Sequence, residues 1–205
     1  GSKIDVRRKP MERKHSELIL SILEQLPQME HIKLSEIPNI DLYMDQVTSF
    51  MDEHMQRSKR RSEDKILTKT MINNYAKNKL LPPPAKKRYS KEHMLLLIFI
   101  YYFKGILSLN DIQALMKPVT ERFFHGEEGL NVEDIYREVY SLGKEQISVI
   151  KEELLKSYEK ASESFEDAPG EDQDFLQIFS FICLLCFDIY LRKQVIEKLL
   201  DSLTS

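Results

Sequence analysis

Two long apolar segments limit what this chain can fold into. Residues 94–103 read MLLLIFIYYF, and residues 175–191 read FLQIFSFICLLCFDIYL. The first is far shorter than the roughly 20 residues that a helix needs to cross a bilayer. The second is interrupted by Gln177, Ser180 and Asp188, so no membrane-spanning segment is expected. Both are predicted to be core helices, and the second must be buried by the rest of the chain or by a second copy.

Apolar side chains recur at helical spacing along almost the whole chain, and no stretch shows sustained strand-like alternation. The predicted fold class is therefore all-α. Thr68, Ser90 and Ser108 are suitable N-caps, and Pro82 and Pro118 are expected to end the helices that precede them. Helices are expected over residues 12–26, 41–55, 68–79, 90–104, 109–116 and 132–164, with a last helix or helix pair over 175–203.

Charge is distributed unevenly along the chain. The net charge is −3, yet residues 57–92 contain twelve Lys and Arg against three Asp and Glu, a local charge of +9 that leaves −12 elsewhere. Residues 121–205 hold nineteen acidic and nine basic residues. A basic run is more often a solvated face than a binding site, but it is also the electrostatic footprint that nucleic-acid binding requires.

The sequence offers no catalytic or metal-binding constellation. Cys183 and Cys186 fall on neighbouring turns of one apolar helix and have no second pair of ligands, so two buried thiols are expected. The five histidines are scattered, and there is no Gly-rich phosphate loop. Neither an enzyme nor a cofactor is therefore expected. The charged start, residues 3–9, is followed by no signal-type apolar run, which favours a cytoplasmic location.

One predicted helix, over residues 68–79, carries a small polar face opposite an apolar one. Asparagine can bond adenine in two places and lysine can reach guanine or phosphate, so this face has the residue types of a helix that reads the major groove. An ordinary surface helix is the alternative, because two neighbouring asparagines are only mildly unusual there. The face consists of residues spaced i, i+3, i+4 and i+7, namely Thr70, Asn73, Asn74 and Lys77.

Residues 68–116 resemble the DNA-binding half of the mercury-resistance regulator (MerR) family of winged helix-turn-helix transcription factors. In that family a recognition helix leads into a basic wing, and two further helices follow. The matching residues are Ile72, Tyr75, Leu80, Leu81, Pro82, Tyr89, Ser90, Gly105, Ser108, Leu109 and Ile112. Nearly the whole chain, including residues 37–55, also resembles a bacterial family of unassigned function, the domain of unknown function numbered eighteen-thirty-six. That second resemblance implies no activity.

The first resemblance implies a MerR-like winged helix-turn-helix domain followed by a C-terminal helical bundle. The expected segments are an N-terminal helical extension over 1–36, the helix-turn-helix domain over 37–120 and a helical domain for dimerisation, ligand or partner binding over 121–205. Gly1 and Ser2 are typical of a cleaved tag. The helix over 132–164 follows a heptad only loosely, so a homodimer and an intramolecular bundle both stay open. No motif implies an effector.

The expected function is that of a DNA-binding transcriptional regulator whose partner is double-stranded DNA. Base reading is assigned to the polar face of the 68–79 helix. The alternative is a non-enzymatic interaction or adaptor module that keeps the scaffold without DNA binding, with the acidic residues 121–205 as its partner surface. Phosphate contacts are assigned to Arg57, Lys59, Arg60, Arg61, Lys69, Lys86, Lys87, Arg88 and Lys91.

Overall fold

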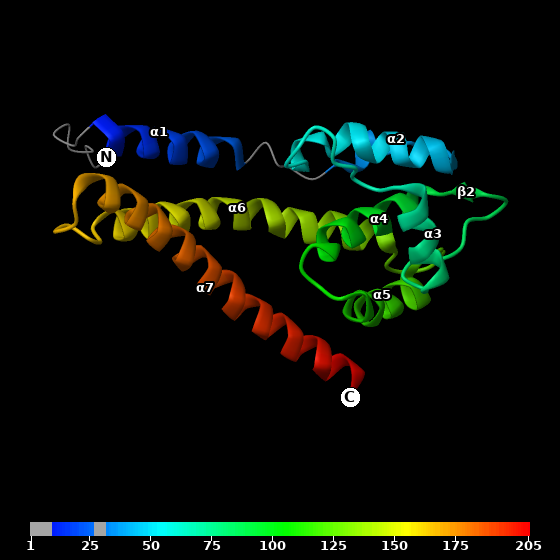
Figure 1. Cartoon of the computed structure of the whole chain (residues 1–205). Helices are drawn as coiled ribbons and strands as arrows, with labels where there is room; N and C mark the ends of the chain where they lie inside the picture. The colour runs from blue at the N-terminus through cyan, green and yellow to red at the C-terminus, as the bar shows by residue number, and fades with distance from the viewer. Residues whose placement is uncertain (1–9, 27–31) are drawn as a thin grey trace. The chain divides into compact units, whose positions relative to one another are not determined.

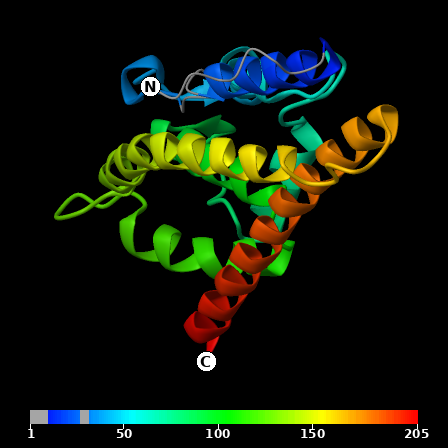
Figure 2. The same ribbon diagram turned by 90° about the vertical axis from the view of Figure 1, so that its left-hand side faces the viewer.

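The structure, a computed structural model, describes residues 10–26 and 32–205 (Figure 1, and turned by 90° in Figure 2). It is mostly helical with one short antiparallel strand pair, so the all-α prediction is confirmed. Two single turns of 3-10 helix, η2 (Leu34–Glu36) and η3 (Gln56–Ser58), connect longer elements. The elements are α1 (Pro10–Gln25), β1 (Leu42–Tyr43), α2 (Met44–His54), α3 (Lys69–Lys77), β2 (Arg88–Tyr89), α4 (Lys91–Lys104), α5 (Leu109–Phe123), α6 (Val132–Ser162) and α7 (Gly170–Thr204).

The chain forms two compact units, each built from separate stretches of sequence. Of the described residues, the first unit contains 10–26 and 143–192, and the second contains 32–142 and 193–205. The predicted segments 1–36, 37–120 and 121–205 follow the chain consecutively, whereas α6 and α7 each contribute residues to both units. Residues far apart in sequence therefore share one core.

The core of the second unit is built around α4. Its residues from His93 to Ile100 are all buried, because apolar residues occur on every side of this helix. Ser90 caps its start by accepting a hydrogen bond from the backbone of His93 at 3.4 Å. Ile72 and Tyr75 of α3 and Phe99 of α4 itself are buried, while Tyr102 near the end of α4 is 38% exposed. The prediction of a central core helix is thus confirmed for residues 94–100, whereas Tyr101 and Phe103 are only partly buried.

Helix α5 runs through Pro118 to Phe123, so the prediction that this proline ends the helix is wrong. A proline removes one backbone hydrogen bond but does not by itself unwind a helix that is held by its neighbours. Val119 and Phe123, which follow the proline, pack against the core of the second unit. Their burial keeps the last turn of α5 helical.

In the first unit, one side of α7 packs against the second half of α6, and near its start Gln177 and Ile178 line a small cavity together with Ser16 of α1. Phe181 is buried and meets the ring of Tyr158 edge-on, with 5.5 Å between centroids. The opposite side of α7 is exposed, including Cys186. The prediction that residues 175–191 form a buried core helix with two buried thiols is therefore wrong within the single chain. Among the described residues, α7 is the one helix whose length and composition would suit a membrane crossing.

Candidate nucleic-acid interface

Helix α3 is anchored by its apolar side and leaves its polar face in solvent. Thr68 caps it, because its side-chain oxygen accepts a hydrogen bond from the backbone N–H of Met71 at 3.2 Å. Ile72 and Tyr75 are buried in the second unit, and burial raises the pKa of Tyr75. The exposed face consists of Thr70, Asn73, Asn74 and Lys77. Within residues 10–26 and 32–205, these four side chains make no hydrogen bond or ion pair, so their polar groups are open to a ligand.

The end of α3 is set by backbone geometry before any proline is reached. Lys79 adopts a left-handed conformation with φ of 60°. Its N–H donates to the carbonyl of Ala76 at 3.2 Å, and the N–H of Leu80 donates to the carbonyl of Tyr75 at 2.9 Å. This pair of bonds is the Schellman ending of a helix. Leu80 and Leu81 are then buried, which fixes where the chain leaves the helix.

After Pro82–Pro84 the chain makes a two-residue hairpin turn. Ala85 and Arg88 exchange backbone hydrogen bonds of 3.0 and 3.1 Å. The turn between them consists of Lys86 and Lys87, whose φ angles are 51° and 61°. Positive φ at both central residues is the geometry of the tightest hairpins, and Asn-Gly normally supplies it. Two exposed lysines hold it here, and we call this pair the hairpin tip.

The hairpin tip is attached to the rest of the second unit through β2. Tyr89 pairs with Leu42 of β1, and Arg88 pairs with Tyr43. The Arg88 guanidinium also donates a hydrogen bond to the Tyr43 hydroxyl at 2.8 Å and lies 4.9 Å from its ring centroid. Tyr43 therefore orients the guanidinium of Arg88, the residue directly after the hairpin tip. In Figure 1, α3 and the hairpin that leads into β2 lie on the same side of this unit.

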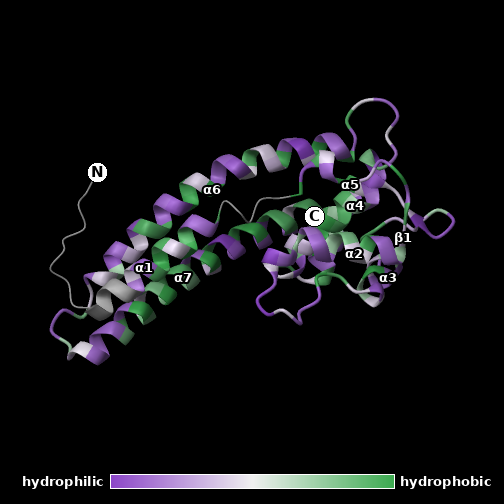
Figure 3. Cartoon of the chain, turned by 90° about the horizontal axis from the view of Figure 1, so that it is seen from above, coloured by the Kyte–Doolittle hydropathy of each residue, from purple (hydrophilic) through white to green (hydrophobic). Residues whose placement is uncertain are grey.

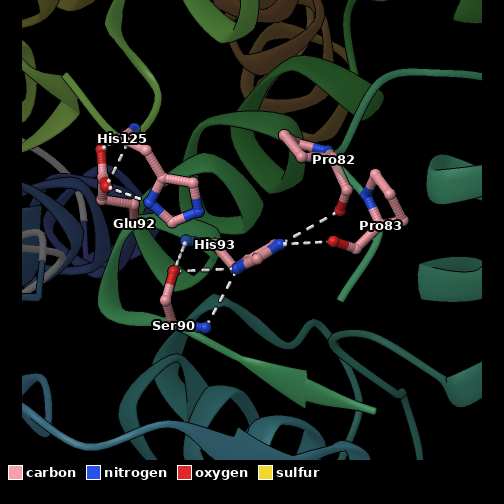
Figure 4. A network of polar contacts seen from close by, with 6 residues as sticks. All are labelled: Pro82, Pro83, Ser90, Glu92, His93 and His125. Carbon is pink, nitrogen blue, oxygen red and sulfur yellow. Dashed lines mark hydrogen bonds and ion pairs between the residues drawn. The ribbon is translucent and has the colours of Figure 1, made fainter. Parts of the chain in front are cut away.

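A buried histidine joins the start of the hairpin to the start of α4 (Figure 4). His93 Nε2 lies 3.1 Å from the carbonyl oxygen of Pro82 and 3.3 Å from that of Pro83. Its Nδ1 lies 3.0 Å from the backbone N–H of Ser90. These partners require the neutral ring with its proton on Nε2, since carbonyls only accept and the Ser90 N–H only donates. Burial lowers the pKa of His93, and the Pro83 and Pro82 carbonyls oppose that shift in part.

The remaining predicted phosphate contacts differ in exposure and in the acidic side chains that they contact. Lys59 forms an ion pair with Asp52 at 2.7 Å, and only 10% of its side chain is exposed. Lys69 pairs with Asp45 on the surface. Lys91 contacts Asn39 at 3.1 Å and Glu133 at 3.4 Å. Lys59 and Lys91 therefore serve local structure. Arg57, Arg60 and Arg61 are exposed in the loop after α2, together with both lysines of the hairpin tip.

Two residues belong to this surface that the sequence analysis did not assign. Lys79 is exposed at the end of α3, two residues beyond Lys77. Tyr43 holds Arg88 from a strand 45 residues away in sequence. Lys79 could have been found as part of the basic run. Tyr43 carried no local signal, because its role depends on the pairing of β1 with β2.

The comparisons with known proteins give a family without an assigned role. A family model described as Domain of unknown function (DUF1836) matches residues 32–139, slightly more than half of the chain. The match includes α3, the hairpin tip and α4. No curated protein and no solved structure shows significant similarity to the chain. On this match, the chain belongs to the DUF1836 family.

Proposed function

We propose that this protein binds double-stranded DNA as a transcriptional regulator, with α3 in the major groove and the hairpin tip on the phosphate backbone. The observation that carries the proposal is the hairpin tip. Two lysines occupy backbone conformations that cost an L-residue other than glycine roughly 1–2 kcal/mol each. Strain retained at an exposed site is a reason to look for a function there, and paired cations at a protruding turn suit phosphate oxygens.

The order of elements supports the same interpretation. Helix α2 packs on α3, a hairpin follows, and α4 and α5 come next. This is the order of recognition helix, wing and further helices that the MerR-like resemblance implies. One difference is that the exposed basic loop between α2 and α3 is longer than the short turn of an ordinary helix-turn-helix. In this proposal its arginines, Arg57, Arg60 and Arg61, add phosphate contacts beside the helix.

The residues of this surface have different roles because their side chains differ in charge. Asn73 and Asn74 carry no charge, and their amides can bond the N6 and N7 atoms of adenine in the major groove. Lys86 and Lys87 are point charges with no preference for a base, so they supply affinity and fix the position of the protein on the duplex. Arg88 is held on Tyr43 at a fixed position beside the tip. The acidic residues elsewhere in the chain would keep DNA on this surface.

The proposal is tested by fluorescence anisotropy with a labelled duplex of random sequence, measured over a series of salt concentrations. Each phosphate contact contributes about 0.9 to the slope of log K against log salt concentration. Changing Lys86 and Lys87 to Ala should therefore reduce the slope by about 2 and weaken binding to every sequence. Changing Lys117 and Arg122 to Gln, two exposed cations on α5, removes the same charge and should leave the slope unchanged.

Two outcomes would count against the proposal. If the unmodified protein binds no duplex at low salt, DNA binding is excluded and the adaptor interpretation replaces it. If the α5 control lowers the slope as much as the hairpin variant does, binding depends on total charge and the hairpin has no special part in it.

A further inference from the structure

Helix α7 has two apolar sides in the first unit, and only one of them is covered. On the covered side, Leu184 and Leu185 face Ile150 and Leu154 of α6 across a groove. Gln177 donates a hydrogen bond to the carbonyl of Ser164 at 2.9 Å. On the opposite side lies a row of exposed residues, which we call the outer stripe: Phe175, Phe179, Ile182, Cys186 and Ile189.

The outer stripe has the spacing of a helix-pairing seam. Its members follow one another at steps of four, three, four and three residues, the a and d positions of a heptad. Helix α7 is apolar on nearly every side, so other rows share this spacing, and it is the exposure that singles out the outer stripe as the row left uncovered within the chain. In Figure 3 hydrophobic residues predominate along much of α7, with hydrophilic residues between them. The pattern therefore points to another helix as the partner.

The exposed area is large for a single chain. Phe175, Phe179, Ile182 and Ile189 are between 52% and 66% exposed, and the adjoining Tyr190 is 62% exposed. With about 150–250 Å² of surface for each large side chain, the stripe and Tyr190 present roughly 600 Å² of mainly apolar surface. That is at the upper end of what monomeric proteins expose. Two such stripes together would bury roughly 1,200 Å², the area at which specific interfaces begin.

The charges at the ends of the stripe identify a second copy as the partner and set its direction. Glu171 lies four residues before Phe175 and Lys193 lies four residues after Ile189, so both continue the helical face of the stripe, whereas Arg192 is turned towards Glu153 of α6. We propose that two copies of the chain pair through the outer stripes of α7 in antiparallel orientation, centred on Ile182. Glu171 of each copy then lies opposite Lys193 of the other, one such pair at each end. A parallel pair would place like charges together.

In this arrangement the two-fold axis passes between the two Ile182 side chains, and Phe175 of each copy lies opposite Ile189 of the other. The contact is the same on both copies, as a two-fold dimer requires. The helix predicted over residues 132–164 is the other candidate for dimerisation, but Val139 and Leu142 of α6 form no comparable repeat. The proposal does not depend on DNA binding.

A membrane surface is the competing partner for an apolar helix of this length. The covered side of α7 argues against it. Arg192 of α7 forms an ion pair with Glu153 of α6 at 3.2 Å, and residues 144–160 of α6 contain eight charged side chains. Inserting α7 would either break its contacts with α6 or carry these charges into the bilayer, at roughly 2.5–3.5 kcal/mol each near the centre.

The mass of the full chain in solution tests the proposal, measured by light scattering over a range of concentrations. The unmodified protein should be a dimer, and Ile182→Glu should be a monomer with unchanged helical content by circular dichroism. Val149→Glu changes an exposed apolar residue on α6 of the same unit and should remain a dimer. A monomer at about 0.1 mM, where even weak interfaces associate, would overturn the proposal. So would a dimer that persists in Ile182→Glu.

Disulfide formation between different variants tests the orientation. In chains with Cys183 and Cys186 changed to Ser, Phe175→Cys is mixed with Ile189→Cys and the mixture is oxidised. Antiparallel pairing predicts a bond between the two different chains. Bonds only between identical chains would show a parallel dimer and overturn the antiparallel assignment. Flotation with anionic phospholipid vesicles tests the competing membrane partner. The dimer should not bind the vesicles, and vesicle binding by a monomeric chain would assign the outer stripe to a membrane instead.

Discussion

Replacing Lys86 with Asn and Lys87 with Gly should make the protein more stable and, at the same time, weaken its binding to DNA. Both lysines have positive φ, 51° and 61°. Asn-Gly is the pair that a two-residue turn of this geometry prefers. Glycine has no Cβ to clash with the neighbouring carbonyl, and asparagine tolerates this region better than lysine. The unmodified hairpin tip is therefore the less stable of the two sequences.

The size of the effect follows from the backbone. Removing the Cβ at residue 87 should raise the free energy of unfolding by about 1 kcal/mol. This is the low end of the energy that a left-handed backbone conformation costs a residue with a Cβ. Asparagine at residue 86 adds less, because its Cβ remains. For a chain of this size, 1 kcal/mol raises the midpoint of thermal unfolding by about 2–4 °C. Loss of two phosphate contacts should lower the salt slope of DNA binding by about 2.

Thermal unfolding followed by circular dichroism and anisotropy titrations with duplex DNA measure the two effects separately. The matched control changes both lysines to Ala, which removes the same charges but keeps a Cβ at each position. It should lose affinity equally and gain no stability. If the Asn-Gly variant is no more stable than the Ala-Ala variant, the turn is not strained. If the Asn-Gly variant binds DNA like the unmodified protein, the lysines do not contact phosphate.

Three other changes test the remaining parts of the structure. Asn73→Ala should lose roughly 1–3 kcal/mol on a duplex chosen by selection from random sequences and leave non-specific binding almost unchanged, because an amide reads base edges and carries no charge; equal losses on both would contradict base reading. Phe99→Ala should cost about 3–5 kcal/mol by denaturant unfolding, since Phe99 packs against Phe103 and Tyr136 in the core; an unchanged midpoint would contradict its burial. Burial lowers the pKa of His93 in the folded chain, so the unfolded chain binds more protons as the pH falls. The contribution of His93 to stability is therefore complete above pH 6.5 and declines below it. In His93→Gln this decline should be smaller, and an identical pH profile would mean that another group is responsible.

Much of the second unit could be predicted from local sequence. Thr68 and Ser90 are caps that act on the residues immediately after them, and both make the expected bonds. The apolar segment from Met94 to Ile100 is buried as predicted, between a serine cap and a glycine that bound α4. The polar face of α3 follows from spacing alone, because the opposite residues Ile72 and Tyr75 had to be buried.

The features that could not be predicted depend on contacts between distant residues. The hairpin tip contains no Asn or Gly from which a turn could be predicted. It forms because Arg88 and Tyr89 pair with a strand more than 40 residues earlier in the sequence. Lys59 looked like its neighbours in a basic run, and only the position of Asp52 on α2 makes it an ion-pair partner. Helix α7 is apolar all round, so its sequence did not say which side would face α6.

Leu200, near the end of α7, is 4% exposed and belongs to the hydrophobic core of the second unit, which otherwise comes from residues 31–142. During synthesis, a chain that has reached residue 142 has made α2 to α5 but lacks this side chain. The core stays incomplete until the whole of the other unit has also been made. The two units therefore cannot fold one after the other in the order of synthesis, as consecutive domains usually do. A fragment covering residues 32–139 would be left with an apolar surface where Leu200 belongs.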